Sequence, residues 1–215
     1  MENVEGQKFV FPDIYQFPPF FTKQVNERTW KAQCTSWIDL ILSYCEHYKI
    51  WTLDLDRTRS STQDTSTPHG EIDGELFRNP SINRGLNIEV IREIFRQMVD
   101  QGRGEWDKGE STDLVDYSDS YIKGNKTSGK ETTLLVYFKS PQEWANVITD
   151  WIDRSGQNGT VFTLYELSYG ELVEGEPFYS IHPAILRRVV DILVQRGKAA
   201  LMTGDGNRIA GVKIL

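Results

Sequence analysis

The sequence predicts a mainly helical α+β protein with two tandem winged-helix domains and an extended N-terminal arm rich in proline and aromatic residues. Three observations predict this fold. Amphipathic helices alternate with short strands, the same order of elements recurs in both halves, and two corresponding helices end at glycines 95 residues apart, Gly102 and Gly197. Three helices followed by a hairpin form the winged-helix arrangement, a relative of the helix-turn-helix.

The first half of the chain begins with a buried amphipathic helix. In NERTWKAQCTSWIDLILSYCEHYKI the apolar residues recur at spacings of three and four. A short strand is expected in IWTLDL, a second helix after Asn87 in NIEVIREIFRQMVDQG, and further strands in RGEWD and TTLLVYFK. The polar stretches 57–74 and 109–131 hold few apolar residues, so we expect mobile surface loops there.

The second half starts with a capped helix. Ser140 can cap it, Pro141 takes the first helical position, Glu143 follows three residues after the cap, and Gly156 ends the helix. A short strand and helix are expected in TVFTLYELSYGE, a further helix in HPAILRRVVDILVQRG, and a hairpin in KAALMTGDGNRIAGVKIL with GDGN as its turn. We therefore expect the arm and first winged-helix domain at residues 1–139 and the second winged-helix domain at residues 140–215.

The charge of the chain bears on its partners. The formal net charge is -7 at pH 7, and both halves are acidic, with -5 over residues 1–139 and -2 over residues 140–215. Tandem winged helices suggest a DNA-binding transcriptional regulator as the alternative function, with Arg187, Arg188 and Arg196 on the recognition helix. The acidic balance argues against a nucleic-acid partner, because duplex binding depends on an excess of Lys and Arg.

No enzymatic constellation stands out in the sequence. His47, His69 and His182 lie apart, without a Cys/His or carboxylate cluster at catalytic or metal-ligand spacing, so we expect no enzyme activity, cofactor or metal. Cys34 and Cys45 lie eleven residues apart in one helix, which predicts buried free thiols. The N-terminus does not resemble a signal peptide, and no run of about 18 apolar residues occurs, so a cytosolic or nuclear location is expected.

The arm FPDIYQFPPFFT, at residues 11–22, places five aromatic side chains and three prolines ahead of the first helix. A proline-to-aromatic step occurs twice, six residues apart, from Pro12 to Tyr15 and from Pro18–Pro19 to Phe21. In polyproline II geometry, with about three residues per turn, both aromatic residues would face the same side. Such a pre-ordered face could dock in a partner's groove. The alternative is that the arm covers its own domain.

Several segments resemble the small subunit of the endosomal sorting complex required for transport, complex II. They are FPPFFT, the helix with Trp30 and Trp37, the GEW step at Gly104–Trp106, PQEWANVITDWIDRSGQNGTVFTLYEL at 141–167 and the C-terminal GVKIL. The resemblance covers nearly the whole chain in order. It implies a non-enzymatic tandem winged-helix adaptor, two copies of which attach to two core subunits in a Y-shaped assembly.

The resemblance also implies partner-binding residues. In the family, a PPxF-type motif docks in a hydrophobic pocket on a winged helix of each core subunit. Pro18, Pro19 and Phe21 match this motif with Phe20 in the variable place, and the neighbouring Phe17 completes the candidate set. The upstream copy, Pro12 and Tyr15, departs from it, because Asp13 stands where a second proline would be. We therefore expect the apolar arm to be exposed in the isolated chain.

For the second domain, the resemblance implies a contact with a subunit of complex III at the endosomal membrane, in the sorting of cargo into multivesicular bodies. The protein would then be cytoplasmic and reach the membrane only through its complex. No motif assigns the complex III surface. The segments 57–80 and 107–131 look longer than the usual connections of the family, and their roles are open.

Overall fold

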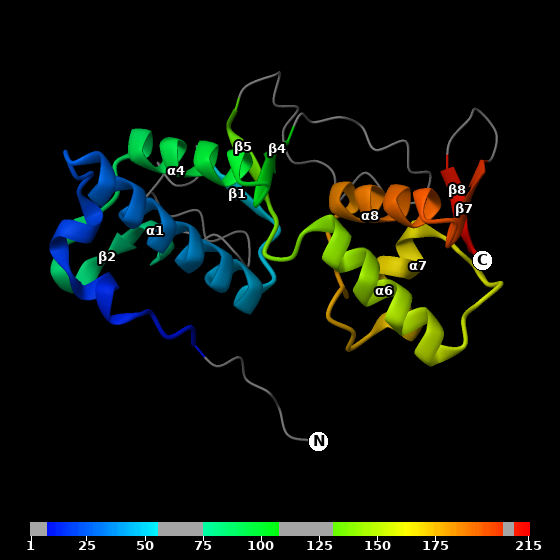
Figure 1. The fold of residues 1–215 in the computed structure, drawn as a ribbon. Helices are drawn as coiled ribbons and strands as arrows, with labels where there is room; N and C mark the ends of the chain where they lie inside the picture. Colours follow the sequence, from blue (N-terminus) through cyan, green and yellow to red (C-terminus); the bar gives the residue numbers. More distant parts are fainter. Residues whose placement is uncertain (1–7, 56–74, 108–130, 204–208) are drawn as a thin grey trace. The chain divides into compact units, whose positions relative to one another are not determined.

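The computed structural model describes residues 8–55, 75–107, 131–203 and 209–215, which form two compact units (Figure 1). The described part of unit 1 comprises residues 8–55, 75–106 and 131–138, and that of unit 2 comprises residues 107, 139–203 and 209–215. The chain last passes from unit 1 to unit 2 between Phe138 and Lys139, one residue before the boundary expected from the capped helix. The loops expected at 57–74 and 109–131 and the GDGN turn fall on residues outside the described ranges, apart from Glu131.

Unit 1 combines two long helices with a small antiparallel sheet. Helix α1 (Glu27–Tyr48) contacts helix α4 (Ile88–Asp100). The sheet has the order β1-β5-β4, from strands β1 (Thr52–Asp54), β4 (Gly104–Trp106) and β5 (Thr133–Val136). A second, two-stranded hairpin pairs β2 (Arg78–Asn79) with β3 (Arg84–Gly85) around the 3-10 turn η3 (Pro80–Ile82).

Unit 2 has the complete order of a winged helix. Helix α6 (Pro141–Ser155) leads to strand β6 (Val161–Phe162), the short helix α7 (Leu164–Tyr169), the 3-10 turn η4 (Glu171–Val173) and helix α8 (Pro183–Gln195). Strands β7 (Ala199–Thr203) and β8 (Ile209–Ile214) then complete an antiparallel sheet of order β6-β8-β7 (Figure 1). The predicted fold class, α+β with two tandem winged-helix domains, is confirmed.

The two units repeat the same hydrogen bonds where their helices end. Gly102 and Gly197 both have a φ of 68°, the left-handed conformation that favours glycine. The N–H of Arg103 donates to the carbonyl of Met98 at 2.8 Å, and that of Lys198 donates to the carbonyl of Leu193 at 2.9 Å. The repeat inferred from these glycines is therefore a repeat of structure.

Side-chain caps fix where helices begin. Asn87 caps α4 by accepting from the Glu89 N–H at 2.9 Å. The capping box predicted for α6 is present, because Ser140 Oγ accepts from the Glu143 N–H at 3.2 Å and Glu143 Oε2 accepts from the Ser140 N–H at 2.7 Å. A second capping box, between Thr163 and Glu166, begins α7 and was not anticipated from the sequence.

The cores are aromatic and aliphatic. The large side chains that are almost fully buried include Trp37, Tyr44 and Phe95 in unit 1 and Trp144 and Phe178 in unit 2. Cys34 and Cys45 are both buried, and neither forms a disulfide, as predicted. Among the described residues, Gln33, Asn79 and Ser168 are the buried polar side chains. None of the helices in these ranges is both long and apolar enough to cross a membrane.

Candidate partner-docking site

The N-terminal arm packs along α1 and runs antiparallel to it (Figure 1). Near the C-terminal end of α1, the Phe9 N–H donates to Tyr48 Oη at 3.0 Å. Further towards the start of α1, Trp37 Nε1 donates to the Phe20 carbonyl at 3.0 Å. The arm therefore lies over one side of the helix that the sequence predicted to be buried, and it supplies part of the cover.

Two 3-10 turns shape the arm, η1 (Asp13–Gln16) and η2 (Pro18–Phe21). Pro12, with φ -67° and ψ 157°, has the polyproline II conformation expected from the sequence, but the turns do not, and that expectation is wrong for them. At the start of η1 the Tyr15 N–H donates to the Pro12 carbonyl at 2.8 Å. At the start of η2 the Phe20 N–H donates to the Phe17 carbonyl at 2.9 Å. The arm is thus folded and compact.

Three aromatic side chains of the arm point into unit 1. Phe20 stacks on Trp37 with ring centroids 4.3 Å apart, and Phe21 meets the same indole edge-on at 5.4 Å. Tyr15 contacts Phe21 at 5.2 Å, so the two aromatic residues do face the same side, but inwards. Tyr15, Phe20 and Phe21 are 3%, 3% and 5% exposed. The expectation that the arm is exposed in the isolated chain is wrong for these three residues, because they complete the core around Trp37.

The hydroxyl of Tyr15 is also held inside unit 1. It donates a hydrogen bond to the backbone carbonyl of Glu75. Burial raises the pKa of Tyr15 well above its ordinary value, since a phenolate would lose its hydration, and the Glu75 carboxylate adds to the rise. The side chain therefore acts as a neutral donor that ties the first turn of the arm to the chain near residue 75.

Other arm residues remain at the surface. Phe17 is 57% exposed, and Pro18 and Pro19 beside it are exposed as well. We call Phe17, Pro18 and Pro19 the docking tip. Pro12 is also exposed, as are the large hydrophobic residues Val10, Ile14 and Val25. In the described part of unit 1, every exposed large hydrophobic side chain belongs to residues 10–25.

Gln33 of α1 holds the arm just after the tip. Its Nε2 donates to the carbonyls of Phe20 at 2.7 Å, Thr22 at 3.1 Å and Pro19 at 3.3 Å, while its Oε1 accepts from the Gln24 N–H at 3.3 Å. This role of Gln33 was not predicted from the sequence. Its spacing, three residues after Trp30 and four before Trp37, placed it on the buried stripe and was the available signal.

Asn79 holds the arm just before the tip. Its Nδ2 donates to the Tyr15 carbonyl at 2.7 Å, and its Oδ1 accepts from the Ser81 N–H at 3.0 Å, capping η3. Ser81 Oγ also donates to Gln16 Oε1 at 3.0 Å. The β2–β3 hairpin lies in a stretch for which no strands were predicted. Through Asn79 it supports the arm before the tip, whereas Gln33 supports it after the tip.

The end of the arm is fastened by charge. Lys23 Nζ lies 2.6 Å from Glu93 Oε2 on α4, and Trp30 Nε1 donates to Glu93 Oε1 at 2.9 Å. Lys23 also lies over the Trp30 ring, 5.2 Å from its centroid. Because this carboxylate is shared between the arm and α1, it fixes where the arm joins the first helix.

The described ranges contain no group of three or more His, Cys, Asp or Glu that could hold a metal ion. His47 lies in the last turn of α1, and His69 lies outside the described residues. His182 caps α8, with Nδ1 accepting from the Ala184 N–H at 3.3 Å. Burial lowers the pKa of His182, which favours the neutral imidazole that can accept this bond.

Two winged-helix units with a folded aromatic arm define a protein of the tandem winged-helix class, whose candidate site is a surface. A family model described as ESCRT-II complex subunit matches residues 14–182, and the chain belongs to this family. It is 34% identical over 209 residues to the vacuolar protein-sorting-associated protein 25 of Homo sapiens, covering 97% of this chain and 98% of the relative. For the protein of the same name from Danio rerio the identity is 33% over 206 residues, and for that of Saccharomyces cerevisiae it is 30% over 213 residues, each covering 95% of this chain and 98% of the relative.

Solved structures agree with this assignment. The crystal structure of subunit VPS25 of the endosomal trafficking complex ESCRT-II matches with a TM-score of 0.72 at 28% identity, covering 95% of this chain and 98% of that chain. The crystal structure of endosomal complex ESCRT-II (VPS22/VPS25/VPS36) matches with a TM-score of 0.68, at the same identity and coverage. The alternative of a DNA-binding regulator finds no support in these comparisons.

Proposed function

We propose that this chain is a non-enzymatic adaptor of an endosomal sorting complex, and that two copies attach to core subunits equivalent to VPS22 and VPS36. The family match and the likeness to VPS25 in a VPS22/VPS25/VPS36 complex support the choice of partners. The chain would act by binding several partners at once, because an adaptor needs separate binding surfaces on rigid units and no reactive centre. The tandem winged-helix arrangement provides two such units.

The first contact in this proposal is made by the docking tip. The observation that carries it is the confinement of exposed large hydrophobic residues, in the described part of unit 1, to residues 10–25, with Phe17 at 57% exposure. An exposed aromatic ring next to two prolines is a suitable anchor for a hydrophobic pocket, because it loses little conformational freedom on binding. Phe17, Pro18 and Pro19 would enter the pocket. Phe20 and Phe21 would keep the arm attached to unit 1 by packing on Trp37.

Alanine substitution of the tip tests this part of the proposal. Phe17→Ala and Pro19→Ala should weaken binding to the co-purified core subunits, by about thirtyfold for Phe17, which corresponds to about 2 kcal/mol at an interface anchor. Val25→Ala is the matched control, because Val25 is an exposed hydrophobic residue just after the arm and lies outside the tip. Calorimetric titration would measure both. Unchanged affinity in a folded Phe17→Ala protein would refute docking by the tip.

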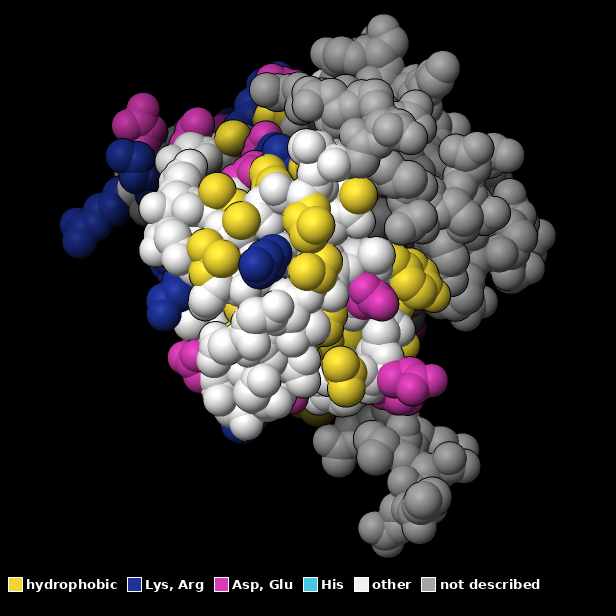
Figure 2. Space-filling view, turned by 90° about the vertical axis from the view of Figure 1, so that its right-hand side faces the viewer, with side chains coloured by type: hydrophobic (Ala, Val, Ile, Leu, Met, Phe, Trp, Pro, Cys, Tyr) yellow, Lys and Arg dark blue, Asp and Glu magenta, His cyan; other side chains and the backbone are white. Residues whose placement is uncertain are grey.

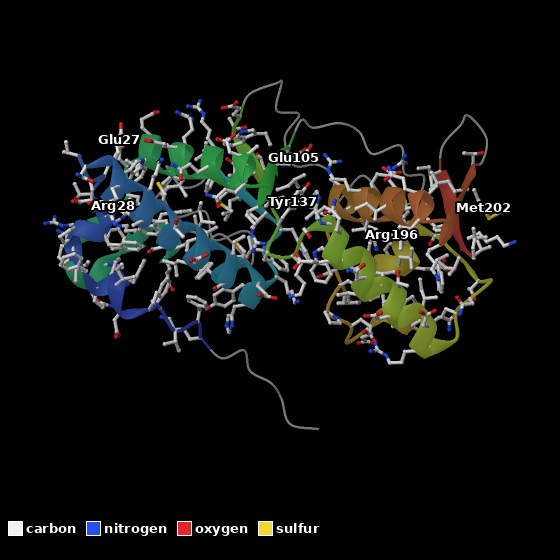
Figure 3. All side chains as sticks on the ribbon, viewed as in Figure 1. Glu27, Arg28, Glu105, Tyr137, Arg196 and Met202 are labelled. Atoms are coloured by element: carbon white, nitrogen blue, oxygen red, sulfur yellow. The ribbon has the colours of Figure 1, made fainter. Side chains whose placement is uncertain are left out.

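The second contact would join unit 2 to a subunit of complex III. Its support is an outer face of the β6-β8-β7 sheet on which hydrophobic side chains surround Lys213. Val161, Lys213 and Ala200 lie side by side across the three strands, and Met202 follows on the same face of β7. Val161 is 47% exposed and Met202 45%. Figure 2, which views unit 2 from the β7 and β8 end, shows hydrophobic side chains gathered around one basic side chain, and Figure 3 labels Met202 at the outer edge of β7.

A cytoplasmic protein that reaches the endosome only through its partners completes the proposal. The net charge of -7 supports an indirect membrane contact, because direct attraction to anionic lipid needs clustered Lys and Arg. Vesicle flotation would test it. The isolated chain should stay unbound to vesicles containing phosphatidylserine, and should float only when the core subunits are added.

A further inference from the structure

The docking tip is bracketed by two buried amide side chains. Asn79 binds the carbonyl of Tyr15, two residues before Phe17, and Gln33 binds those of Pro19 and Phe20, at the end of the tip and directly after it. Gln33 is 8% exposed and Asn79 is 3% exposed. Within the described residues, two of the three buried polar side chains therefore serve the backbone on either side of the tip.

The tip cannot hold its own conformation well. Pro18 and Pro19 have no N–H, and the backbone hydrogen bonds at the two ends of η2 run from the Phe20 N–H to the Phe17 carbonyl and from the Thr22 N–H to the Pro19 carbonyl. Isolated 3-10 turns of four residues have poor hydrogen-bond geometry and little cooperativity. The conformation of this turn must therefore come from its surroundings, and the amides supply directional contacts that stacking on Trp37 does not.

We propose that Gln33 and Asn79 are positioning residues that hold the tip in its docking conformation and thereby set its affinity for the core subunits. This inference rests on docking by the tip as proposed above. Both side chains are buried in unit 1, so neither is exposed for contact with a partner. The N–H donors of each amide bind carbonyl oxygens of the arm. Displacing the arm by one residue would leave these buried N–H groups without acceptors, which costs free energy.

The expected effect on binding follows from the fraction of molecules in which the tip is ordered. A partner that recognises the ordered tip binds with an apparent affinity reduced in proportion to the fraction of molecules in which the tip is ordered. If loss of one bracket lowers that fraction to about a tenth, affinity falls about tenfold without loss of any contact at the interface. The same loss should appear as faster exchange of the Phe20 and Thr22 amides, whose N–H groups close the turn.

Isosteric variants of the full-length protein separate positioning from packing. Gln33→Glu keeps the oxygen that accepts from Gln24 but replaces the donor to three carbonyls with an acceptor. Asn79→Asp keeps the cap on Ser81 and removes the amide donor to the Tyr15 carbonyl and to Gln16 Oε1. Leu135→Val in β5 is the control for stability, because it trims the buried core of unit 1 at a strand that makes none of the arm's hydrogen bonds.

The measurements are affinity for the co-purified core subunits, the thermal midpoint, and hydrogen exchange at residues 20 and 22. We expect both isosteric variants to lose about tenfold in affinity and amide protection together, whereas Leu135→Val lowers the midpoint and keeps affinity. Protected amides with full affinity in Gln33→Glu and Asn79→Asp would overturn the positioning role. So would fast exchange with full affinity. If Phe17→Ala also leaves affinity intact, the docking proposal itself has failed, and the two failures are thereby distinguished.

Discussion

Trp37 and Phe20 hold each other in two ways. Their rings are stacked, with centroids 4.3 Å apart and planes 5° apart, and the indole Nε1 of Trp37 donates to the Phe20 carbonyl at 3.0 Å. Trp37 is 0% exposed in this arrangement. Lifting the arm off α1 would expose a tryptophan and leave its N–H without this acceptor. The arm is consequently part of the folded unit 1, and only its outer side is available to partners.

The buried side of the arm predicts a loss of stability in Phe21→Ala. Phe21 is 5% exposed and contacts Trp37 and Tyr15, so truncation leaves a cavity and should lower the free energy of unfolding of unit 1 by roughly 3 kcal/mol. Phe17→Ala is the matched control, since its ring is mostly in solvent and its removal should change stability by less than about 0.5 kcal/mol. Urea unfolding followed by tryptophan fluorescence measures both. Equal midpoints for the two variants would show that the arm leaves α1 in solution.

Cys34 predicts a loss of stability at alkaline pH. Burial raises the pKa of its thiol to about 12, and the nearby Glu93 carboxylate adds to the rise. The unfolded thiol ionises above about pH 8.5, so the stability that Cys34 contributes is fully present below that pH and declines as pH rises towards 12. The decline is at most about 1.4 kcal/mol per pH unit, or about 2 kcal/mol between pH 8.5 and 10.

Urea unfolding at pH 7.5, 9 and 10 would measure this dependence. The control is Cys34→Ala, which should be less stable at pH 7.5 but lose less stability between pH 7.5 and 10 than the parent protein. Parallel pH profiles for the two proteins would contradict a protonated buried thiol as the source. Comparing how the free energy of unfolding changes with pH in the two proteins removes the destabilisation caused by the substitution itself, because that destabilisation is the same at every pH.

Helices, strands and caps could largely be predicted from the sequence, because they depend on local signals. Asn87, Ser140 and Gly197 each act within a few residues of their own position, and each does what its pattern indicates. The conformation of the arm could not be obtained this way. Prolines in sequence favour an extended backbone, but stacking of Phe20 on Trp37 and the amide of Gln33 select 3-10 turns instead, and both partners lie more than twelve residues away.

The location of the candidate site could be predicted from the sequence, but only some of its residues could. Sequence alone points to residues 11–22, but it gives each aromatic residue the same apolar character. Only the packing separates the outward Phe17 from the inward Phe21, at 57% against 5% exposure. Gln33 and Asn79 are polar residues whose burial depends entirely on the carbonyls of a distant segment, so composition and periodicity do not single out their role.

The capped start of α6 predicts that residues 139–215 fold without unit 1. This segment contains every strand and helix that the structure describes in unit 2, including the buried Trp144, Phe178 and Val212. A fragment of these residues should unfold cooperatively, and Ser140→Ala should destabilise it by about 1 kcal/mol through loss of the cap. Circular dichroism during thermal unfolding would report both results. Val147→Ala, which trims a half-buried residue of α6 without touching the cap, shows how much of the effect is specific to capping. A gradual, non-cooperative transition would mean that unit 2 depends on the rest of the chain.

The outer face of the unit 2 sheet predicts a variant that separates the two proposed contacts. Met202→Asp places a carboxylate on the face that holds Val161, Lys213 and Ala200. Docking of an apolar partner surface over Met202 would then have to desolvate this carboxylate. Binding of a complex III subunit should fall by about thirtyfold or more, equivalent to about 2 kcal/mol, while binding to the core subunits through the arm should stay unchanged.

Leu172→Asp is the matched control, because Leu172 is 60% exposed but belongs to η4 rather than to the sheet. Surface plasmon resonance with each partner in turn gives the comparison. If Leu172→Asp abolishes complex III binding and Met202→Asp does not, the contact lies over η4 and the sheet face is not the docking surface.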